Sequence, residues 1–209
     1  MDHQEVRDCY DRDAGLYASL FLDELSRDRQ SLLMIDRFAA IASPLDGLVV
    51  DVGCGPGYLV NHLCELGLNA VGYDLSAGQI AEARKAFPER DFDIGDLANL
   101  DAEDGTLAGI TARHSIIHTT PSTFERVFLE WNRSLVQGAP IFLSFYGSLS
   151  ASEHGMPFDH KVVTAHQLFP EVLADQLRDT GFTNIENETT PIPEGGRPFN
   201  HVTMLAIKR

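Results

Sequence analysis

The 209-residue chain has little of several features that mark other classes of protein. No run approaches the roughly 18 apolar residues that a membrane-spanning helix needs, so we expect no membrane segment. The first twenty residues alternate charged and apolar groups, which is not the pattern of a secretion signal. The three cysteines are odd in number and lack metal-ligand spacing. They therefore favour a reducing, cytoplasmic location over a disulfide framework.

Basic residues are also scarce. Sixteen lysines and arginines stand against 31 aspartates and glutamates, which gives a net charge of −15, and no basic run occurs. A surface of this sign repels the phosphate backbone of nucleic acid, so nucleic acid is a poor substrate candidate. The length predicts a single domain over residues 1–209, and the sequence leaves open whether the protein is a monomer or a homodimer.

Strand and helix patterns alternate along the chain, which predicts an α/β fold with a doubly wound parallel sheet. An N-terminal helical cap is expected over 1–44, with one long helix that starts at Leu25 and ends at Ser43-Pro44. The expected strands are Leu48–Val52, Ala70–Asp74, Asp91–Ile94, Leu107–Ala112, Pro140–Tyr146, Phe182–Thr189 and His201–Lys208. Later helices are expected from about Pro121 to Gln137 and over Gln167–Thr180. Residues 147–166 keep aromatic and apolar side chains without a clear period, which predicts a long functional loop.

The segment from Leu48 to Gly57 is the most informative part of the chain. A β-branched apolar run ends near Asp51, and glycine then occupies alternate positions at 53, 55 and 57. This pattern predicts a buried strand, a tight turn and a helix, in which the absent Cβ atoms let a ligand lie against the main chain. The G-x-G-x-G spacing differs from the G-x-G-x-x-G of dinucleotide folds, and the Lys-Ser/Thr of a P-loop is absent.

With Asp51 before the glycines and Asp74 ending the next strand, this segment resembles the first motif of class I S-adenosylmethionine-dependent methyltransferases. The Tyr10-Asp11…Tyr17 stretch and Ser115-Ile116-Ile117-His118 are similar to the bacterial small-molecule branch of that family. The resemblance covers the chain from about Tyr10 onward. It implies a Rossmann-like seven-stranded sheet with an antiparallel last strand, S-adenosylmethionine as cofactor, and residues 147–166 as a substrate lid.

The resemblance also implies which residues hold each part of the cofactor. The backbone at Gly53, Gly55 and Gly57 would contact the methionine moiety, with Asp51 orienting its ammonium group. Asp74 sits where a carboxylate accepts both ribose hydroxyls. The other expected contacts are Leu75 on the adenine face, Asp96 and Leu97 at the adenine edge, Arg113 near the sulfonium, and Tyr10 and Tyr17 closing over the methionine end.

Methyl transfer also needs a route for the proton of the acceptor, and histidine is the usual agent near neutral pH. His118 is the leading candidate for the base because it follows the fourth strand; His114 is the second, as a neighbour of the cofactor. The residues expected to line the acceptor pocket are Tyr146, His154, Met156, Phe158, His160 and His201. His114 and His118 are four apart, but the Glu of H-E-x-x-H is missing between them, so no metal is expected.

The expected function is methylation of an oxygen or nitrogen atom on a small acceptor of the secondary-metabolite type. Two other functions stay open. A nicotinamide-dependent oxidoreductase is disfavoured by the glycine spacing. A protein that binds the cofactor without methylating, as a scaffold, a sensor or the catalyst of another rearrangement, depends only on the uncertain identity of the base.

Overall fold

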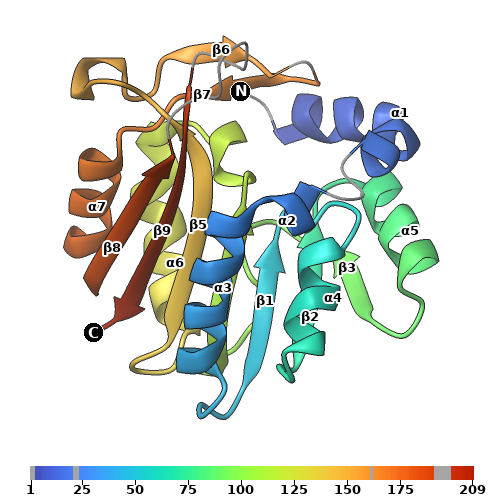
Figure 1. The fold of residues 1–209 in the computed structure, drawn as a ribbon, viewed down its shortest axis with the longest axis horizontal. Coiled ribbons are helices and arrows are strands. Elements are labelled where there is room, and N and C mark those ends of the chain that lie inside the picture. The colour runs from blue at the N-terminus through green and yellow to red at the C-terminus, as the bar shows by residue number, and fades with distance from the viewer. Residues whose placement is uncertain (1–2, 21–23, 161, 191–198) are drawn as a thin grey trace.

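A seven-stranded sheet forms the centre of the protein, seen here in a computed structural model that describes residues 3–20, 24–160, 162–190 and 199–209 (Figure 1). The strand order is β3-β2-β1-β4-β5-β9-β8. These strands are β1 Leu48–Val52, β2 Ala70–Asp74, β3 Asp91–Ile94, β4 Leu107–Arg113, β5 Pro140–Gly147, β8 Phe182–Thr190 and β9 Asn200–Lys208. Strands β1 to β5 pair in parallel, and β9 pairs antiparallel with both β5 and β8. The predicted α/β fold with an antiparallel last strand is therefore confirmed.

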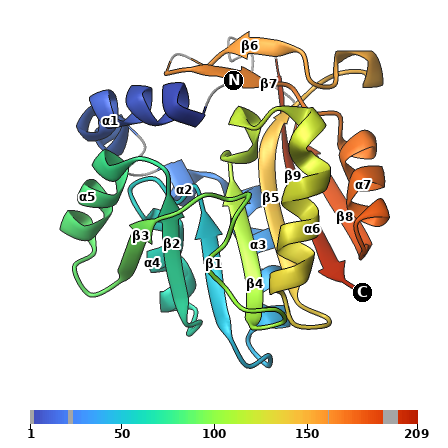
Figure 2. The ribbon, with the colours of Figure 1, turned by 180° about the vertical axis from the view of Figure 1, so that it is seen from behind.

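Helices cover both faces of the sheet (Figure 2). They are α3 Arg29–Ala42, α4 Tyr58–Glu65 and α5 Ala77–Ala86 on one face, and α6 Phe124–Ser134 and α7 Pro170–Asp179 on the other. Phe38 of α3 packs in the first core and Trp131 of α6 in the second, and both side chains are fully buried. Because helices cover both faces, the central strands β4 and β5 are buried along nearly their whole length, whereas the edge strands β3 and β8 are mostly exposed.

Two further segments lie over the carboxyl ends of the parallel strands (Figure 1). One is α1 His3–Leu20, which packs on the start of α5, where the Asp11 carboxylate accepts hydrogen bonds from Ser76 Oγ at 2.6 Å and Gly78 N at 2.8 Å. The other is a small antiparallel hairpin of β6 Pro157–Asp159 and β7 Thr164–His166. We call these two segments the cover.

Three predicted elements differ from the structure. The long helix predicted from Leu25 to Ser43-Pro44 ends where expected but is divided in two, because Asp28 follows α2 (Glu24–Arg27) and caps α3 by accepting from Ser31 N at 3.0 Å. The loop predicted over 147–166 contains the β6–β7 hairpin and a 3₁₀ turn, Ala151–Glu153. The helix predicted from Gln167 begins at Pro170, whose fixed φ suits the first helical position.

Short 3₁₀ turns also form at Ile116–His118 and at Pro121–Thr123, the latter directly before α6. The Pro/Gly-rich loop predicted over 190–200 falls mostly on residues 191–198, which lie outside the described part of the chain. No described helix has the length and apolar character required to cross a membrane.

Candidate functional site

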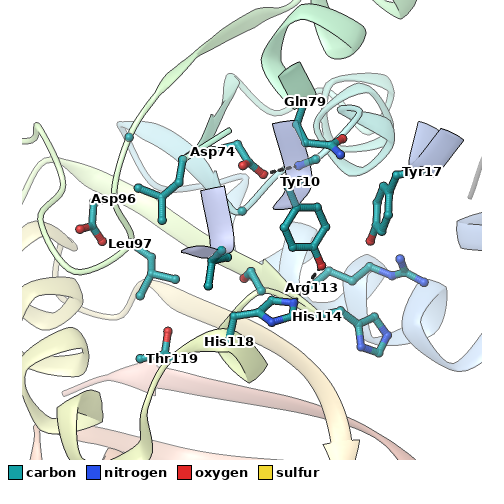
Figure 3. Close-up of a pocket in the computed structure, with 16 residues that line it drawn as sticks. Tyr10, Tyr17, Asp74, Gln79, Asp96, Leu97, Arg113, His114, His118 and Thr119 are labelled. Atoms are coloured by element: carbon teal, nitrogen blue, oxygen red, sulfur yellow. Dashed lines mark hydrogen bonds between the residues drawn. The ribbon is translucent and has the colours of Figure 1, made fainter. Parts of the chain in front are cut away.

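The turn after β1 and the end of β2 form one wall of a cleft at the carboxyl edge of the sheet (Figure 3). Gly55 N donates a hydrogen bond to Asp74 Oδ2 at 2.9 Å, and Ser76 N donates to Oδ1 at 2.9 Å. Burial raises the pKa of Asp74, and these two amides act against that rise. Each carboxylate oxygen keeps a second lone pair, so Asp74 can accept further hydrogen bonds from a ligand in the cleft.

The three glycines of the turn differ in what they do. All have positive φ, +71° at Gly53, +51° at Gly55 and +84° at Gly57. A Cβ atom at Gly55 would meet no atom closer than 3.8 Å, on Tyr17 across the cleft. At Gly53 it would lie 2.3 Å from Ser115 Cβ, and at Gly57 2.5 Å from Phe92. Gly55 thus keeps ligand space open, whereas Gly57 serves packing and does not line the cleft.

The empty space of the cleft is about 740 Å³, a figure that includes space open to solvent. Asp96 and Leu97 lie on one side of it and Tyr17 and Arg113 on the other, with Tyr10 between them in this view (Figure 3). Asp96 Oδ1 accepts from Ala98 N at 2.8 Å, and Leu97 O accepts from Trp131 Nε1 at 2.8 Å. The lining residues are Val6, Tyr10, Tyr17, Gly53, Gly55, Asp74, Leu75, Gln79, Gly95, Asp96, Leu97, Arg113, His114, Ser115, His118 and Thr119.

Asp51 lies in a side pocket that shares Tyr17, Gly53, Gly55 and Arg113 with the cleft. Its side chain is buried, and Oδ1 accepts a hydrogen bond from Thr111 Oγ1 at 2.7 Å. Burial raises the pKa of Asp51 to about 7, against the opposing effects of the Thr111 hydroxyl and the Arg113 charge. A cationic group entering this side pocket would favour the ionised form of Asp51.

Arg113, at the end of β4, forms an ion pair with Asp28. Its guanidinium lies 3.4 Å from Asp28 Oδ2, and His201 Nε2 lies 3.7 Å from the same oxygen. Asp28 thus caps α3 and also balances the charge of the cationic side chain that faces both pockets. An Asp three residues before Ser31 was the available sequence signal for this cap, but its link to Arg113 depends on the fold.

His118 connects the two parts of the cover. Tyr10 Oη of α1 lies 2.8 Å from His118 Nε2, and His118 Nδ1 lies 3.3 Å from Thr164 O of β7. Because a carbonyl can only accept, Nδ1 carries the hydrogen and Nε2 accepts from the Tyr10 hydroxyl. Burial lowers the pKa of His118 to about 4. Both ring nitrogens are therefore engaged, and the ring is neutral at physiological pH.

His114 lies beside it in a strained position. Its φ of +55° is unusual for a residue other than glycine. The ring stacks on His201 at 5.1 Å between centroids, and it contacts Tyr146 in a tilted arrangement at 4.9 Å between centroids. Burial, with a smaller contribution from Arg113, holds the pKa of His114 well below its usual range. Its Nδ1 is buried and has no hydrogen-bond partner among the residues that the structure describes.

The residues predicted to line the acceptor pocket separate into two groups. Tyr146, Phe158 and His160 pack together behind His114 and His118, with Phe199 beside them, and His201 stacks on His114. His154 accepts from Phe169 N at 3.0 Å, at the start of α7, and Met156 is largely exposed. None of these six predicted residues lines the cleft itself.

Several lining residues were not predicted from the sequence. They are Val6, Gln79, Gly95, Ser115 and Thr119. Ser115 follows the strained residue, and its Cβ occupies the space that a side chain at Gly53 would need. Ser115 belongs to the Ser115-Ile116-Ile117-His118 stretch that carries part of the resemblance, but its contact with Gly53 joins the turns after β1 and β4 and has no local sequence signal. Among the described residues, no group of three or more His, Cys, Asp or Glu side chains is placed to hold a metal ion.

Comparison with known proteins places this geometry in context. Residues 49–138 match the family described as "Methyltransferase domain". Trans-aconitate 2-methyltransferase of Methylobacterium nodulans is 39% identical over 97 residues, 44% of this chain and 34% of that protein. Norajmaline N-methyltransferase of Rauvolfia serpentina is 32% identical over 124 residues, 55% of this chain and 42% of that protein. The chain thus matches well under half the length of either curated relative.

A solved structure shares the fold over nearly all of the chain. It is Haemonchus contortus phosphoethanolamine N-methyltransferase 2, in complex with phosphomonomethylethanolamine and S-adenosylhomocysteine. The TM-score is 0.73 at 19% identity, over 97% of this chain and 60% of that one. The domain match and the shared fold confirm the resemblance described above.

Proposed function

We propose that the protein transfers a methyl group from S-adenosylmethionine to a small organic acceptor, and the match of residues 49–138 to the methyltransferase-domain family supports this. The observation that carries this proposal is the position of Asp74. Its carboxylate is fixed by two backbone amides at the end of β2 and faces a cleft beside an open glycine turn. That arrangement suits the two hydroxyls of a ribose.

The other lining residues fit the remaining parts of the cofactor. Leu75 and Leu97 offer apolar contact to adenine, and Asp96 offers a carboxylate at its edge. The methionine end would enter the side pocket, where Asp51 meets the ammonium and Arg113 the carboxylate. A Cβ atom at residue 55 would begin to fill the space beside the glycine turn. That open space supports a path for the methionine part of the cofactor from the cleft into the side pocket.

When bound, the cofactor supplies an electrophilic methyl group on a sulfonium, and the protein's task is alignment in a water-poor site. Tyr10 and Tyr17, in edge contact at 5.4 Å between centroids, cover the cleft from α1. The hydrogen bond between Tyr10 and His118, with the contact of His118 with Thr164 O, joins α1 to the hairpin and so connects the two parts of the cover. We therefore assign His118 to closing the site, because both of its ring nitrogens are already used.

The acceptor is proposed to be a small molecule of the secondary-metabolite type, methylated on oxygen or nitrogen in the cytoplasm. The net charge of −15 supports this against nucleic acid. Both curated relatives carry names of small-molecule methyltransferases, one acting on an acid and one on an amine. We call the end of the cleft lined by Val6, Tyr10, His114, Ser115, His118 and Thr119 the acceptor end.

The experiment that tests this function compares cofactors first and turnover second. Calorimetry should show one-site binding of S-adenosylhomocysteine and none of NADH; the reverse result would establish the oxidoreductase alternative. Incubation with S-adenosylmethionine labelled on the methyl group and a panel of small alcohols, acids and amines should then release label into a product. Binding without transfer to any member of a broad panel would instead support a non-methylating role.

A further inference from the structure

The acceptor end of the cleft is built from rings and hydroxyls. Tyr10, His114 and His118 form its larger walls, with Ser115 and Thr119 between them. None of the described residues that line this end is a lysine or a carboxylate. The nearest cation on the cleft wall, Arg113, is balanced by Asp28 at 3.4 Å. A polycarboxylate would find little to pair with here.

A second layer of rings backs these walls. His160 contacts His118 at 5.2 Å between centroids, Tyr146 contacts His114 at 4.9 Å, and Phe158 contacts Tyr146 at 5.6 Å. These rings come from β5 and the β6 hairpin, so the fold brings them together from distant parts of the chain. The contacts of His118 with His160 and of Tyr146 with Phe158 are edge to face, at 79° and 87°, and that of His114 with Tyr146 is tilted by 35°. Rings packed in this way form a rigid and largely apolar wall, which favours a planar aromatic ligand that can join such contacts.

His114 is the polar residue of this wall whose backbone is strained. Its backbone strain persists because the surrounding structure imposes it, with His114 N donating to Ser144 O at 2.9 Å. Strained residues of this kind cluster at functional sites. A buried polar atom without a partner is costly, and such atoms in native structures call for a functional explanation. The buried Nδ1 of His114 and the buried Oγ of Ser115 are two such atoms, and of these only the imidazole is basic enough to take up a proton. Both nitrogens of His118 are already hydrogen-bonded.

Building on the proposed function, we propose that the methyl acceptor is an uncharged planar alcohol or amine, and that its nucleophilic O–H or N–H donates a hydrogen bond to the imidazole of His114. The neutral ring of His114 is then the first receiver of the proton that leaves as the O–CH₃ or N–CH₃ bond forms and the S–CH₃ bond breaks. His118 acts on the cover and not on the acceptor.

The test uses protein loaded with S-adenosylhomocysteine and two matched probes, 2-naphthol and 2-methoxynaphthalene, which differ in the donor hydroxyl. Fluorescence titration should show that the wild type prefers 2-naphthol by about tenfold, the usual worth of one hydrogen bond in a buried site. His114→Asn and His114→Gly should remove this preference, because both residues tolerate positive φ but neither places an imidazole at the wall. His118→Asn should keep it.

Each other result has a definite meaning. The assignment of His114 would be overturned if His118→Asn lost the preference for 2-naphthol while both His114 variants kept it. Failure of the loaded wild type to bind either naphthalene, or tighter binding of trans-aconitate than of 2-naphthol, would overturn the planar, uncharged class. Affinity for S-adenosylhomocysteine is measured beforehand in every variant and tests the proposed function separately. If the wild type does not bind S-adenosylhomocysteine, the proposed function itself is contradicted.

Discussion

The two ends of the cleft are built in different ways. At the cofactor end, Asp74, Asp96 and the glycine turn follow directly from strand ends, and backbone amides within a few residues or one βα unit fix the side chains. At the acceptor end, His114, His118 and Tyr10 come from separate elements and are fixed by rings and by the cover. The first end depends on local backbone geometry, so it should resist change in the cover. The second depends on contacts over long sequence distances, so it should be easier to disturb.

The largest effect should come from filling the glycine turn. In Gly55→Val the new side chain would occupy the cleft beside Tyr17 and strain a backbone at φ +51°. We expect calorimetry to detect no binding of S-adenosylhomocysteine, with circular dichroism still showing a folded protein. Gly138→Val is the matched control, because Gly138 has φ +81° with open space around it. Retained affinity in Gly55→Val would mean that the turn is structural only.

The next largest effect should come from the ribose contact. Asp74→Ala removes a charged acceptor and should weaken binding of S-adenosylhomocysteine by roughly 2–3 kcal/mol, or about 30- to 150-fold. Asp93→Ala, on the exposed side of the neighbouring strand, should leave the affinity unchanged. An unaltered dissociation constant in a folded Asp74→Ala protein would contradict the assignment of Asp74.

A smaller effect, on pH dependence, should come from the side pocket. Because burial raises the pKa of Asp51 to about 7, this carboxyl is neutral below that pH and must ionise to meet an ammonium group. Affinity for S-adenosylhomocysteine should therefore fall as the pH drops below 7, by up to about tenfold per unit. Thr111→Val should move the midpoint upward, because the Thr111 hydroxyl stabilises the ionised form. In Asp51→Asn the pH dependence of the affinity should vanish. If it persists, a group other than Asp51 causes it.

The same raised pKa affects stability. A carboxyl with a folded pKa above its unfolded value binds more protons in the folded state, so the free energy of unfolding should decrease as pH rises from about 4 through 7. Denaturant titrations at a series of pH values should show this decrease in the wild type and a flatter profile in Asp51→Asn. Equal profiles would mean that Asp51 ionises normally in the free protein.

The smallest effect should come from loosening the cover. Tyr10→Phe deletes the hydroxyl that donates to His118 Nε2, a bond worth about 0.5–1.5 kcal/mol. We expect S-adenosylhomocysteine to dissociate roughly three- to tenfold faster in stopped-flow measurements, with little change in its association rate. Tyr73→Phe, on β2 and away from α1, is the control. If S-adenosylhomocysteine dissociates faster from both variants, the change does not depend on the cover.

The difference between the two ends also explains what could be predicted from the sequence. Asp51, Asp74 and Asp96 could be identified because each ends a readable strand and the parallel sheet brings those ends to one edge. The strain at His114, the pairing of Tyr10 with His118 and the ion pair of Asp28 with Arg113 could not. Each joins residues from separate elements, and their contact depends on how the cover packs. The hairpin strands, three residues each, are too short to show a period.

A crystal structure with S-adenosylhomocysteine would test the central claim most directly, that this cleft binds the methyl donor with its reactive end toward His114. We predict that both ribose hydroxyls lie within hydrogen-bond distance of Asp74, that adenine lies between Leu75 and Leu97, and that the sulfur faces the acceptor end. A ligand bound elsewhere, or one in this cleft with its ribose away from Asp74 and its sulfur away from His114, would contradict the account.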